Sequence, residues 1–200
     1  MKKIGIYGGT FSPPHRGHVS SAEIFSEYLS LDELIIMPDY LPPHKTIDGE
    51  AEAEERLEMS KFAFSHIKNV IVSDYEIKKG GKSYTADTLT HFYKDGEQLY
   101  FLVGTDMFLT LDEWYMPSVI FEKAVICYVR REDSKENDEL LNLKEEEYKG
   151  KFSAKIVRIP NTVTEVSSSE VRALLKAGKN ADCFLSESVY EYIKEKGLYT

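Results

Sequence analysis

Short apolar runs alternate with amphipathic stretches along most of the chain. The runs are rich in β-branched and aromatic residues, and we interpret six of them as strands: Lys3–Gly8, Glu33–Pro38, Asn69–Ser73, Leu99–Gly104, Ala124–Val129 and Lys155–Pro160. After the first run, Val19, Ala22, Phe25 and Leu29 recur at the spacing of an amphipathic helix. Strands that are apolar almost throughout and are joined through helices predict a parallel sheet buried on both faces, with right-handed crossovers.

The expected fold is therefore α/β, a doubly wound, Rossmann-like parallel sheet with helices on both faces, in a single domain over residues 1–200. A further helix is predicted within the charged stretch 51–66. The Glu- and Lys-rich stretch 131–151 is interpreted as a solvated helix or a surface excursion, not as a second domain. Residues 161–200 contain two capped helical patterns and are expected to form a small C-terminal helical segment of the same domain.

The composition restricts the partners that the protein can have. The net charge is −9 and the sequence pI is about 5.2. A surface that follows the phosphates of nucleic acid is usually basic, so we expect neither nucleic acid nor an anionic membrane as a partner. A small anionic ligand remains compatible, because a few local donors are enough to bind it. The sequence leaves the oligomeric state open, with a homo-oligomer as one alternative.

Targeting signals and cysteine usage both favour the cytoplasm. The sequence has no run of about 18 apolar residues that could span a membrane. The basic start Met1-Lys2-Lys3 is not followed by the apolar segment of a signal peptide. Cys127 and Cys183 are far apart and form neither a disulfide framework nor a zinc or redox motif. We therefore expect a cytoplasmic protein with reduced thiols.

The stretch GGTFSPPHRGH, residues 8–18, directly follows the first predicted strand. Gly9 and the glycine before it allow a ligand to approach the backbone closely. A helix that begins near Gly17 would direct its unpaired N–H groups and its positive dipole end toward this loop. His15 and His18 add donors that can bind a phosphate and respond to charge that develops on it. The loop is therefore a candidate anion site.

Competing interpretations of the same residues have less support. The dinucleotide motif G-x-G-x-x-G is absent, because the loop glycines have the wrong spacing. KKGGKS, residues 78–83, is similar to the end of a P-loop, but it lacks the first glycine and does not directly follow a strand, so we interpret it as a turn. Zinc binding by His15 and His18 would need further ligands at zinc spacing, so we expect no metal bound by the protein itself. A purely structural role of the two histidines stays open.

The loop resembles the T/H-x-G-H signature of a nucleotidyltransferase superfamily, and four further stretches follow it in order: LPPHK (41–45), SYTADTL (83–89), GTDMFLTLDEW (104–114) and VSSSEVR (166–172). With them, nearly the whole chain is similar to the bacterial nicotinate-nucleotide adenylyltransferases. The resemblance implies adenylyl transfer from ATP to nicotinate mononucleotide in NAD biosynthesis, which gives deamido-NAD and pyrophosphate. Ser12 departs from the pattern, because the family usually has an acidic residue there.

The same resemblance assigns the ATP side of the reaction. His15 and His18 are the implied catalytic pair, with His18 placed to stabilise the α-phosphate during transfer. The other residues assigned to ATP are Gly9, Thr10, Gly104, Asp106, Ser168, Ser169 and Arg172. The two serines and the arginine would receive the β- and γ-phosphates at a helix N-terminus, and the pair after the fourth strand would serve a ribose. Mg²⁺ is implied as a cofactor that the phosphates of ATP would hold largely by themselves.

Five residues are assigned by resemblance to nicotinate mononucleotide. His44 and Lys45 would reach its phosphate, and Thr85, Trp114 and Tyr115 would surround its pyridine ring, with Trp114 as a stacking face. Some of the functional assignments have a structural alternative.

The structural alternatives are ordinary roles of the same residue types. Ser167 and Glu170 have the spacing of a capping box, which would explain the serine-rich motif without a ligand. Asp106 could cap the next helix, Trp114 could belong to the core and Lys45 could be a solvated loop residue.

Two other functions compete with the favoured one. Phosphopantetheine adenylyltransferases share the histidine loop and the serine-rich motif, although SYTADTL and GTDMFLTLDEW favour a pyridine nucleotide. A non-catalytic nucleotide sensor on the same fold is the alternative from another class, because a fold alone does not establish activity. The presence of His15, His18 and Arg172 argues against the sensor.

Overall fold

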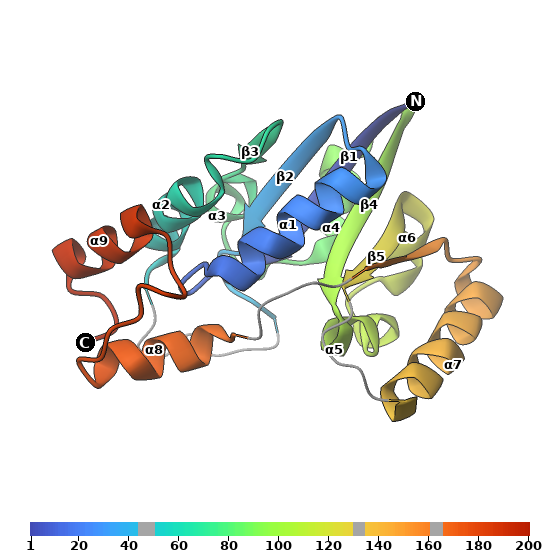
Figure 1. Cartoon of the computed structure of the whole chain (residues 1–200). Coiled ribbons are helices and arrows are strands. Elements are labelled where there is room, and N and C mark those ends of the chain that lie inside the picture. Colours follow the sequence, from blue (N-terminus) through green and yellow to red (C-terminus); the bar gives the residue numbers. More distant parts are fainter. Residues whose placement is uncertain (44–50, 130–134, 161–165) are drawn as a thin grey trace. The chain divides into compact units, whose positions relative to one another are not determined.

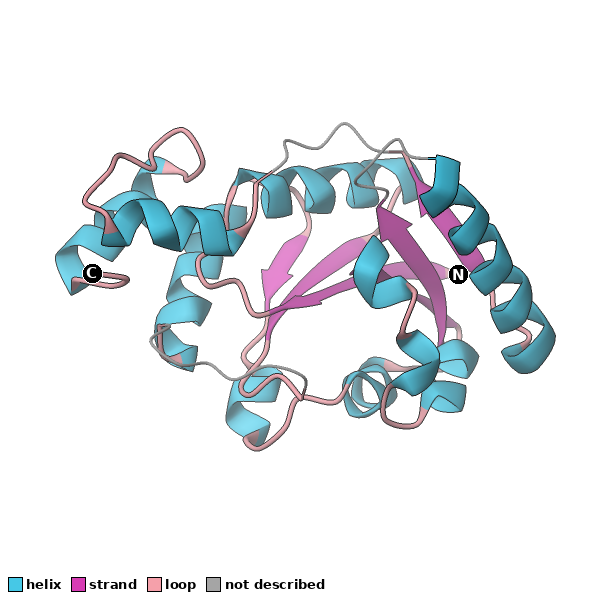
Figure 2. Ribbon diagram, turned by 90° about the horizontal axis from the view of Figure 1, so that it is seen from below, coloured by secondary structure: helices cyan, strands magenta, loops and turns pink. Residues whose placement is uncertain are grey.

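The computed structural model of the chain describes residues 1–43, 51–129, 135–160 and 166–200 (Figure 1). Its six strands form one sheet in the order β3-β2-β1-β4-β5-β6. The strands are drawn in magenta in Figure 2. The strands are β1 (Lys2–Gly9), β2 (Glu33–Pro38), β3 (Val70–Val72), β4 (Glu97–Gly104), β5 (Ala124–Val129) and β6 (Ile156–Ile159). This is the order of a doubly wound sheet, and it reverses between β1 and β4. The predicted α/β class and the predicted parallel sheet are confirmed.

Two compact units divide the chain, and each is described by itself. The first unit comprises Met1–Tyr7, Ile24–Leu34 and Tyr84–Asn161. The second unit comprises Gly8–Glu23, Ile35–Ser83 and Thr162–Thr200. The assignment of residues 1–200 to a single domain stays a prediction.

The first unit is organised around three parallel strand pairs. β1 pairs with β4 from Lys2–Glu97 to Tyr7–Leu102, and β5 pairs with β4 on one side and with β6 on the other. All six residues of β5 are buried, as expected for a strand covered on both faces. A Cβ at Gly5 would lie 2.4 Å from Leu31 Cδ1, so only glycine lets the chain after α1 pack this closely on β1.

Helices and one short 3₁₀ turn surround these strands. α1 (Arg16–Leu29) begins in the second unit and ends in the first. The other helical elements of the first unit are α4 (Thr85–Phe92), α5 (Thr105–Phe108), the 3₁₀ turn η1 (Leu111–Glu113), α6 (Pro117–Lys123) and α7 (Lys135–Phe152). The helix interpretation of stretch 131–151 is thus confirmed from Lys135 onward.

The second unit contains α2 (Ala53–Phe64), α3 (Tyr75–Lys79), α8 (Ser168–Lys176) and α9 (Glu187–Lys196). α2 packs against α9, where the rings of Phe62 and Tyr192 lie 5.6 Å apart. Lys78 and Lys79 end α3, so the turn predicted over KKGGKS begins only at Gly80. Gly80 and Gly81 both have a φ of +69°, which explains the two glycines of this turn. None of the helices in the described part of the chain combines the length and the apolar character that crossing a bilayer requires.

α7 is attached to the sheet by a buried carboxylate. Glu145 accepts hydrogen bonds from Tyr128 Oη at 3.0 Å and from Arg158 Nε at 2.7 Å, and Lys149 Nζ lies 3.3 Å from it. Burial by itself would raise the pKa of Glu145, but these hydrogen bonds and the charge of Arg158 outweigh burial, so the pKa is lowered. Glu145 is therefore ionised and stabilises the docking of α7 at neutral pH.

The contribution of Glu145 to stability should depend on pH. Because its pKa is lower in the folded protein than in the unfolded chain, its contribution is present above the ordinary value of 4.5 and is lost as the pH falls through the folded-state pKa. We expect Glu145→Gln to lower the free energy of unfolding in urea at neutral pH, and the difference from wild type to shrink below that value. Glu146→Gln, at the exposed neighbouring position, is the control and should change little. A difference that stays constant at every pH would contradict the assignment.

Candidate functional site

The loop between β1 and α1 surrounds a buried phenylalanine. The ring of Phe11 packs edge-on against the imidazole of His18, with 5.1 Å between the ring centroids. A Cβ at Gly9 would lie only 3.0 Å from the same ring, so the glycine is required for the close approach of backbone and ring. α1 begins at Arg16, which confirms a helix start near Gly17. The loop thus leads directly into the helix N-terminus that the sequence predicted.

The two histidines form a stacked pair, with ring centroids 3.7 Å apart and an angle of 25° between the rings. His15 N–H donates to His18 Nδ1 at 3.2 Å, and His18 N–H lies 3.4 Å from His15 Nδ1. A ring nitrogen that accepts a hydrogen bond carries no proton, so each neutral imidazole holds its proton on Nε2. His15 is 3% exposed, whereas His18 is half-buried. The pair therefore has a fixed tautomer, with Nε2–H as the donor on each ring.

The serine-rich motif folds as the start of α8 with a complete capping box. Ser167 Oγ accepts from the backbone N–H of Glu170, and the Glu170 carboxylate accepts from Ser167 N–H and Oγ–H, each at 2.8 Å. The hydrogen bond from the Ser167 side chain, followed by that from its backbone, lowers the pKa of Glu170. The capping interpretation of this motif is confirmed, and a phosphate-binding role remains a prediction.

α8 is also hydrogen-bonded to the histidine loop. Arg172 Nη1 donates to Ser12 O at 2.7 Å, and Ser168 Oγ donates to Pro13 O at 3.1 Å. Arg172 Nη2 lies 3.2 Å from Ser169 Oγ. The three residues that the resemblance assigned to the β- and γ-phosphates therefore lie together beside the loop. The side chains of Ser168 and Arg172 each donate a hydrogen bond to a carbonyl group of the loop.

Ser12, the position that departs from the family pattern, is buried. Its hydroxyl lies 3.0 Å from Tyr199 Oη, and its carbonyl accepts from Arg172. Ser12 therefore connects the loop both to α8 and to the last residues of the chain.

An ion pair that the sequence did not predict holds the other side of the loop. Asp39, directly after β2, accepts from Thr10 Oγ1 at 2.8 Å and from Arg56 Nη1 at 2.9 Å. Arg56 also donates to Thr10 O at 2.8 Å and to Tyr40 O at 3.0 Å, and its side chain is 1% exposed. The sequence contained one signal of this role, because Arg56 shares a helical face with Ala53 and Ala63, where a charged residue is unusual.

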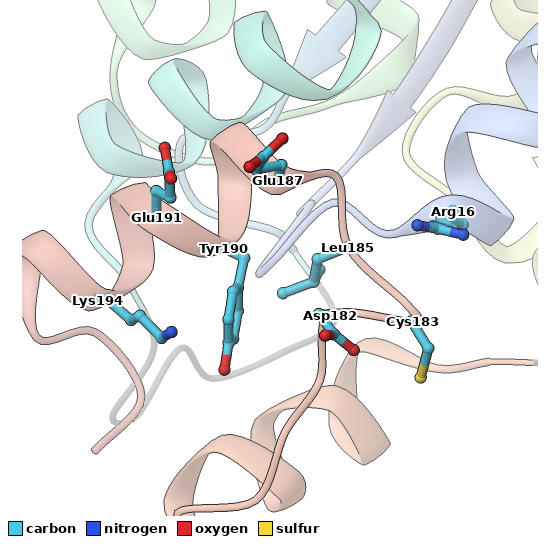
Figure 3. A pocket seen from close by; sticks show the side chains of 8 residues that line it. All are labelled: Arg16, Asp182, Cys183, Leu185, Glu187, Tyr190, Glu191 and Lys194. Carbon is cyan, nitrogen blue, oxygen red and sulfur yellow. The ribbon is translucent and has the colours of Figure 1, made fainter.

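Two cavities lie close to this loop in the second unit. One, of about 450 Å³, lies beside α9, with Tyr190 and Lys194 on one side of it and Arg16 near its far end (Figure 3). The other, of about 360 Å³, is bordered by His15 and by the pair formed by Glu23 and His66. His15 is the one described candidate site residue that lines either cavity.

In the first unit, two short segments carry the candidate residues that follow β4. Gly104 ends β4 and is the N-cap of α5, while Asp106 is exposed in the first turn, so Asp106 does not cap this helix. Thr105 Oγ1 donates to Val129 O at 3.0 Å and holds the start of α5 on β5. Asp106 is thus free of the capping role that was its structural alternative.

The aromatic candidates follow η1. Trp114 is half-buried and packs edge-on against Phe101, with the centroids 6.5 Å apart. Tyr115 is 50% exposed, and its ring lies 4.5 Å from that of Tyr84, the N-cap of α4. Thr85 is the first residue of α4, as the motif predicted. Trp114 is therefore not a fully buried core residue. Tyr84 places Tyr115 near the start of α4, because its ring contacts that of Tyr115 and it directly precedes Thr85.

His44 and Lys45 lie outside the described residues. Among the residues that are described, no group of three His, Cys, Asp or Glu side chains has the arrangement of a metal site.

The comparisons agree with the motifs. The family model described as cytidylyltransferase-like matches residues 6–174. A protein of Caldicellulosiruptor saccharolyticus, named "Probable nicotinate-nucleotide adenylyltransferase", is 36% identical over 197 residues, which cover 98% of each chain. A Listeria monocytogenes protein of the same name is 34% identical over 199 residues, which cover 98% of this chain and 97% of the relative. This chain belongs to the nicotinate-nucleotide adenylyltransferase family.

Solved structures show the same fold. The Plasmodium falciparum nicotinic acid mononucleotide adenylyltransferase, solved in complexes with APC and with NaAD, superposes with a TM-score of 0.78 over 100% of this chain and 98% of that chain, at 19% identity. At this level of identity the likeness concerns the fold alone. The family resemblance inferred from the motifs is confirmed.

Replacing Arg56 tests whether the buried ion pair holds the loop. Arg56→Met leaves Asp39 buried without its partner, so we expect the free energy of unfolding to fall by about 3–5 kcal/mol. Lys61→Met is the control, because Lys61 pairs with Glu58 on the exposed face of the same helix and should cost less than about 1 kcal/mol. Urea denaturation followed by circular dichroism measures both. Equal losses in the two variants would show that the Arg56 pair has no special role.

Proposed function

We propose that this protein transfers the adenylyl group of ATP to nicotinate mononucleotide. A phosphate oxygen of the mononucleotide attacks the α-phosphorus of ATP, the bond from this phosphorus to the bridging oxygen of the β-phosphate breaks, and pyrophosphate leaves with deamido-NAD as the other product. The observation that carries the proposal is the stacked histidine pair at the start of α1, in a chain whose full-length relatives are named for this activity. No protein nucleophile is required, because the substrate supplies the attacking oxygen.

The histidine pair supplies donors where negative charge develops. Catalysis of this type depends on positioning and on preorganised donors rather than on covalent chemistry. The Nδ1 contacts with the backbone fix the ring orientations, which preorganises the pair for donation to a phosphate oxygen. His18 is the more accessible of the two rings and is the donor that we assign to the transferring phosphate.

α8 supports the same loop from its N-terminal end. Arg172 is the cationic group that we assign to the β- and γ-phosphates, beside Ser168 and Ser169. Its bonds to Ser12 O and Ser169 Oγ orient the guanidinium before substrate arrives, which reduces the entropy that binding must overcome. Gly9 and Thr10 lie at the other side of the loop and are assigned to the α-phosphate.

The first unit carries the residues that we assign to the nucleosides. Asp106 and Gly104 serve the ribose of ATP, and Trp114 with Tyr115 faces the pyridine ring. The backbone N–H of Thr85, the first residue of α4, precedes the hydrogen-bond ladder of the helix and suits a carboxylate. Nicotinate has such a carboxylate, whereas nicotinamide would present an NH₂ donor to this donor. We assign His44 and Lys45 to bind the phosphate of the mononucleotide.

The metal is proposed to arrive with the nucleotide. MgATP is the substrate, and its phosphates and water supply most of the ligands of Mg²⁺.

The remaining partner and compartment proposals rest on charge and on the thiols. A net charge of −9 suits small-molecule partners and opposes a general grip on nucleic acid or anionic membranes. Cys127 is buried and Cys183 is exposed, and both are free thiols, which suits the reducing cytoplasm.

The function is tested by pyrophosphate release from MgATP in the presence of single acceptors. We expect release with nicotinate mononucleotide, and a kcat/KM for the corresponding nicotinamide nucleotide that is lower by roughly 10⁴-fold, because a site built from donors leaves the amide unpaired. Phosphopantetheine should not support release. Turnover of phosphopantetheine alone would favour the rival transferase, and ATP binding without turnover of any acceptor would favour the sensor.

The role of His18 is tested by His18→Ala. We expect kcat to fall by about 10²–10³-fold with little change in ATP binding, because one preorganised donor to a developing charge is lost. His66→Ala is the matched control, since His66 is an exposed histidine in the same unit and its Nε2 lies 3.1 Å from a Glu23 carboxylate oxygen. An unchanged kcat in a folded His18→Ala protein would remove His18 from the catalytic pair.

A further inference from the structure

The turn that carries Trp114 and Tyr115 is held from α7. η1 immediately precedes Trp114, and the Trp114 N–H donates to Leu111 O at 3.3 Å. In the middle of η1, Asp112 accepts a hydrogen bond from Tyr148 Oη at 2.9 Å. Lys144 Nζ lies 3.2 Å from both carboxylate oxygens of Asp112. α7, which the sequence suggested as a solvated helix or a surface excursion, therefore reaches a candidate ligand-binding turn.

Tyr148 joins two segments at once. Its hydroxyl lies 2.8 Å from Phe108 O, the last residue of α5, as well as 2.9 Å from Asp112. The single hydroxyl proton is shared between two acceptors that belong to consecutive segments after β4. The ring itself is fully buried and packs against Phe108 and Phe121, with centroid distances of 5.3 and 4.8 Å. Neither segment can shift without breaking a contact to this one side chain.

The charges around Asp112 strengthen the attachment. Its side chain is 13% exposed, and that of Lys144 is 23% exposed. Burial would raise the pKa of Asp112, but the hydrogen bonds from Tyr148 and Lys144 outweigh burial and lower it. Asp112 is therefore an ionised acceptor at neutral pH, and hydrogen bonds to ionised groups are stronger than neutral ones.

We propose that Tyr148, through Asp112 and together with Lys144, is a positioning residue that fixes the Trp114–Tyr115 turn for binding of the mononucleotide. This inference rests on the proposed function, in which these aromatic residues face the pyridine ring. A stacking face that is already fixed costs less conformational entropy on binding than one that must be ordered by the ligand. Tyr148 touches no substrate in this scheme, so its loss should weaken binding of one substrate rather than stop the chemical step.

The chain offers a matched pair of tyrosines for the test. Tyr148 and Tyr128 are both fully buried in the first unit, both rings pack on Phe108, and each hydroxyl donates to a carboxylate of an ion pair. Only Tyr148 holds η1, because Tyr128 donates to Glu145 on α7. Tyr148→Phe and Tyr128→Phe thus remove the same group from equivalent surroundings, and they differ in whether the turn loses its anchor.

Steady-state kinetics is the first measurement. For Tyr148→Phe we expect the KM for nicotinate mononucleotide to rise about tenfold, which corresponds to about 1.4 kcal/mol, with kcat changed less than threefold. Tyr128→Phe should keep the wild-type KM. Lys144→Met, which removes the cation but keeps Tyr148, should change the KM in the same direction by a smaller factor. An equal rise in both tyrosine variants, or none in either, would overturn the proposal.

Trp114 provides a second measurement that does not require activity. It is the single tryptophan of the chain, so tryptophan fluorescence reports on this turn alone. We expect Tyr148→Phe to lower the fluorescence anisotropy and to increase quenching by acrylamide in the folded protein without substrate, and Tyr128→Phe to change neither. Unchanged Trp114 fluorescence in Tyr148→Phe would overturn the positioning role. If the wild-type protein releases no pyrophosphate with nicotinate mononucleotide, the proposed function fails, while the fluorescence still decides whether Tyr148 fixes the turn.

Discussion

The histidine loop depends on one buried guanidinium. Arg56 cannot lose its proton, so its burial costs several kcal/mol unless a counter-charge and hydrogen bonds replace the water. Asp39 supplies the counter-charge and shares Nη1 with the carbonyl group of Thr10, while the carbonyl groups of Tyr40 and Ala51 accept from Nη2 and Nε. These acceptors come from the loop after β1, from the chain after β2 and from the chain just before α2. The bonds that make a buried arginine tolerable therefore also fix these three segments together.

The loop needs such outside support because it has little regular structure of its own. Thr10 is held through Asp39 on one side, and Ser12 and Pro13 are held through Arg172 and Ser168 on the other. Between these anchors, the rings of His15 and His18 stack on each other. His15 N–H also donates to His18 Nδ1, three residues further along the chain, so each histidine restrains the other. Donors held in this way do not have to reorganise when charge develops on a ligand, which is the condition for strong electrostatic stabilisation.

What the sequence could predict was mostly local. β2 and β5 begin and end at the predicted residues, because each is a compact apolar run. The capping box of α8 could also be predicted, since Ser167 and Glu170 are three residues apart. α3 and α6 were not predicted, because helices of five and seven residues are too short to show a helical period.

Long-range partners could not be read from the sequence in the same way. Arg56 was visible as a charged residue on an apolar helix face, but no sequence pattern near it indicated that Asp39 is its partner. The contact from Arg172 to Ser12 spans 160 positions, and the contact from Tyr148 to Asp112 spans 36. Such pairs are decided by the topology of the sheet, which brings distant segments together only after the fold has formed. The family motifs located the candidate residues, whereas the groups that hold them in place carried no motif.

The charges around the loop determine how an anionic substrate could be held there. Arg56 and Asp39 neutralise each other, so the buried pair orders the loop without adding net charge to it. Glu170 places a carboxylate at the N-terminus of α8, where it satisfies Ser167 and offsets part of the helix dipole. The whole protein, at a net charge of −9, repels a nucleotide at long range. On the proposed function, binding of ATP must therefore come from short-range donors, namely the Nε2–H groups of the histidine pair and the guanidinium of Arg172, and from Mg²⁺ that lowers the charge of the nucleotide before it reaches them.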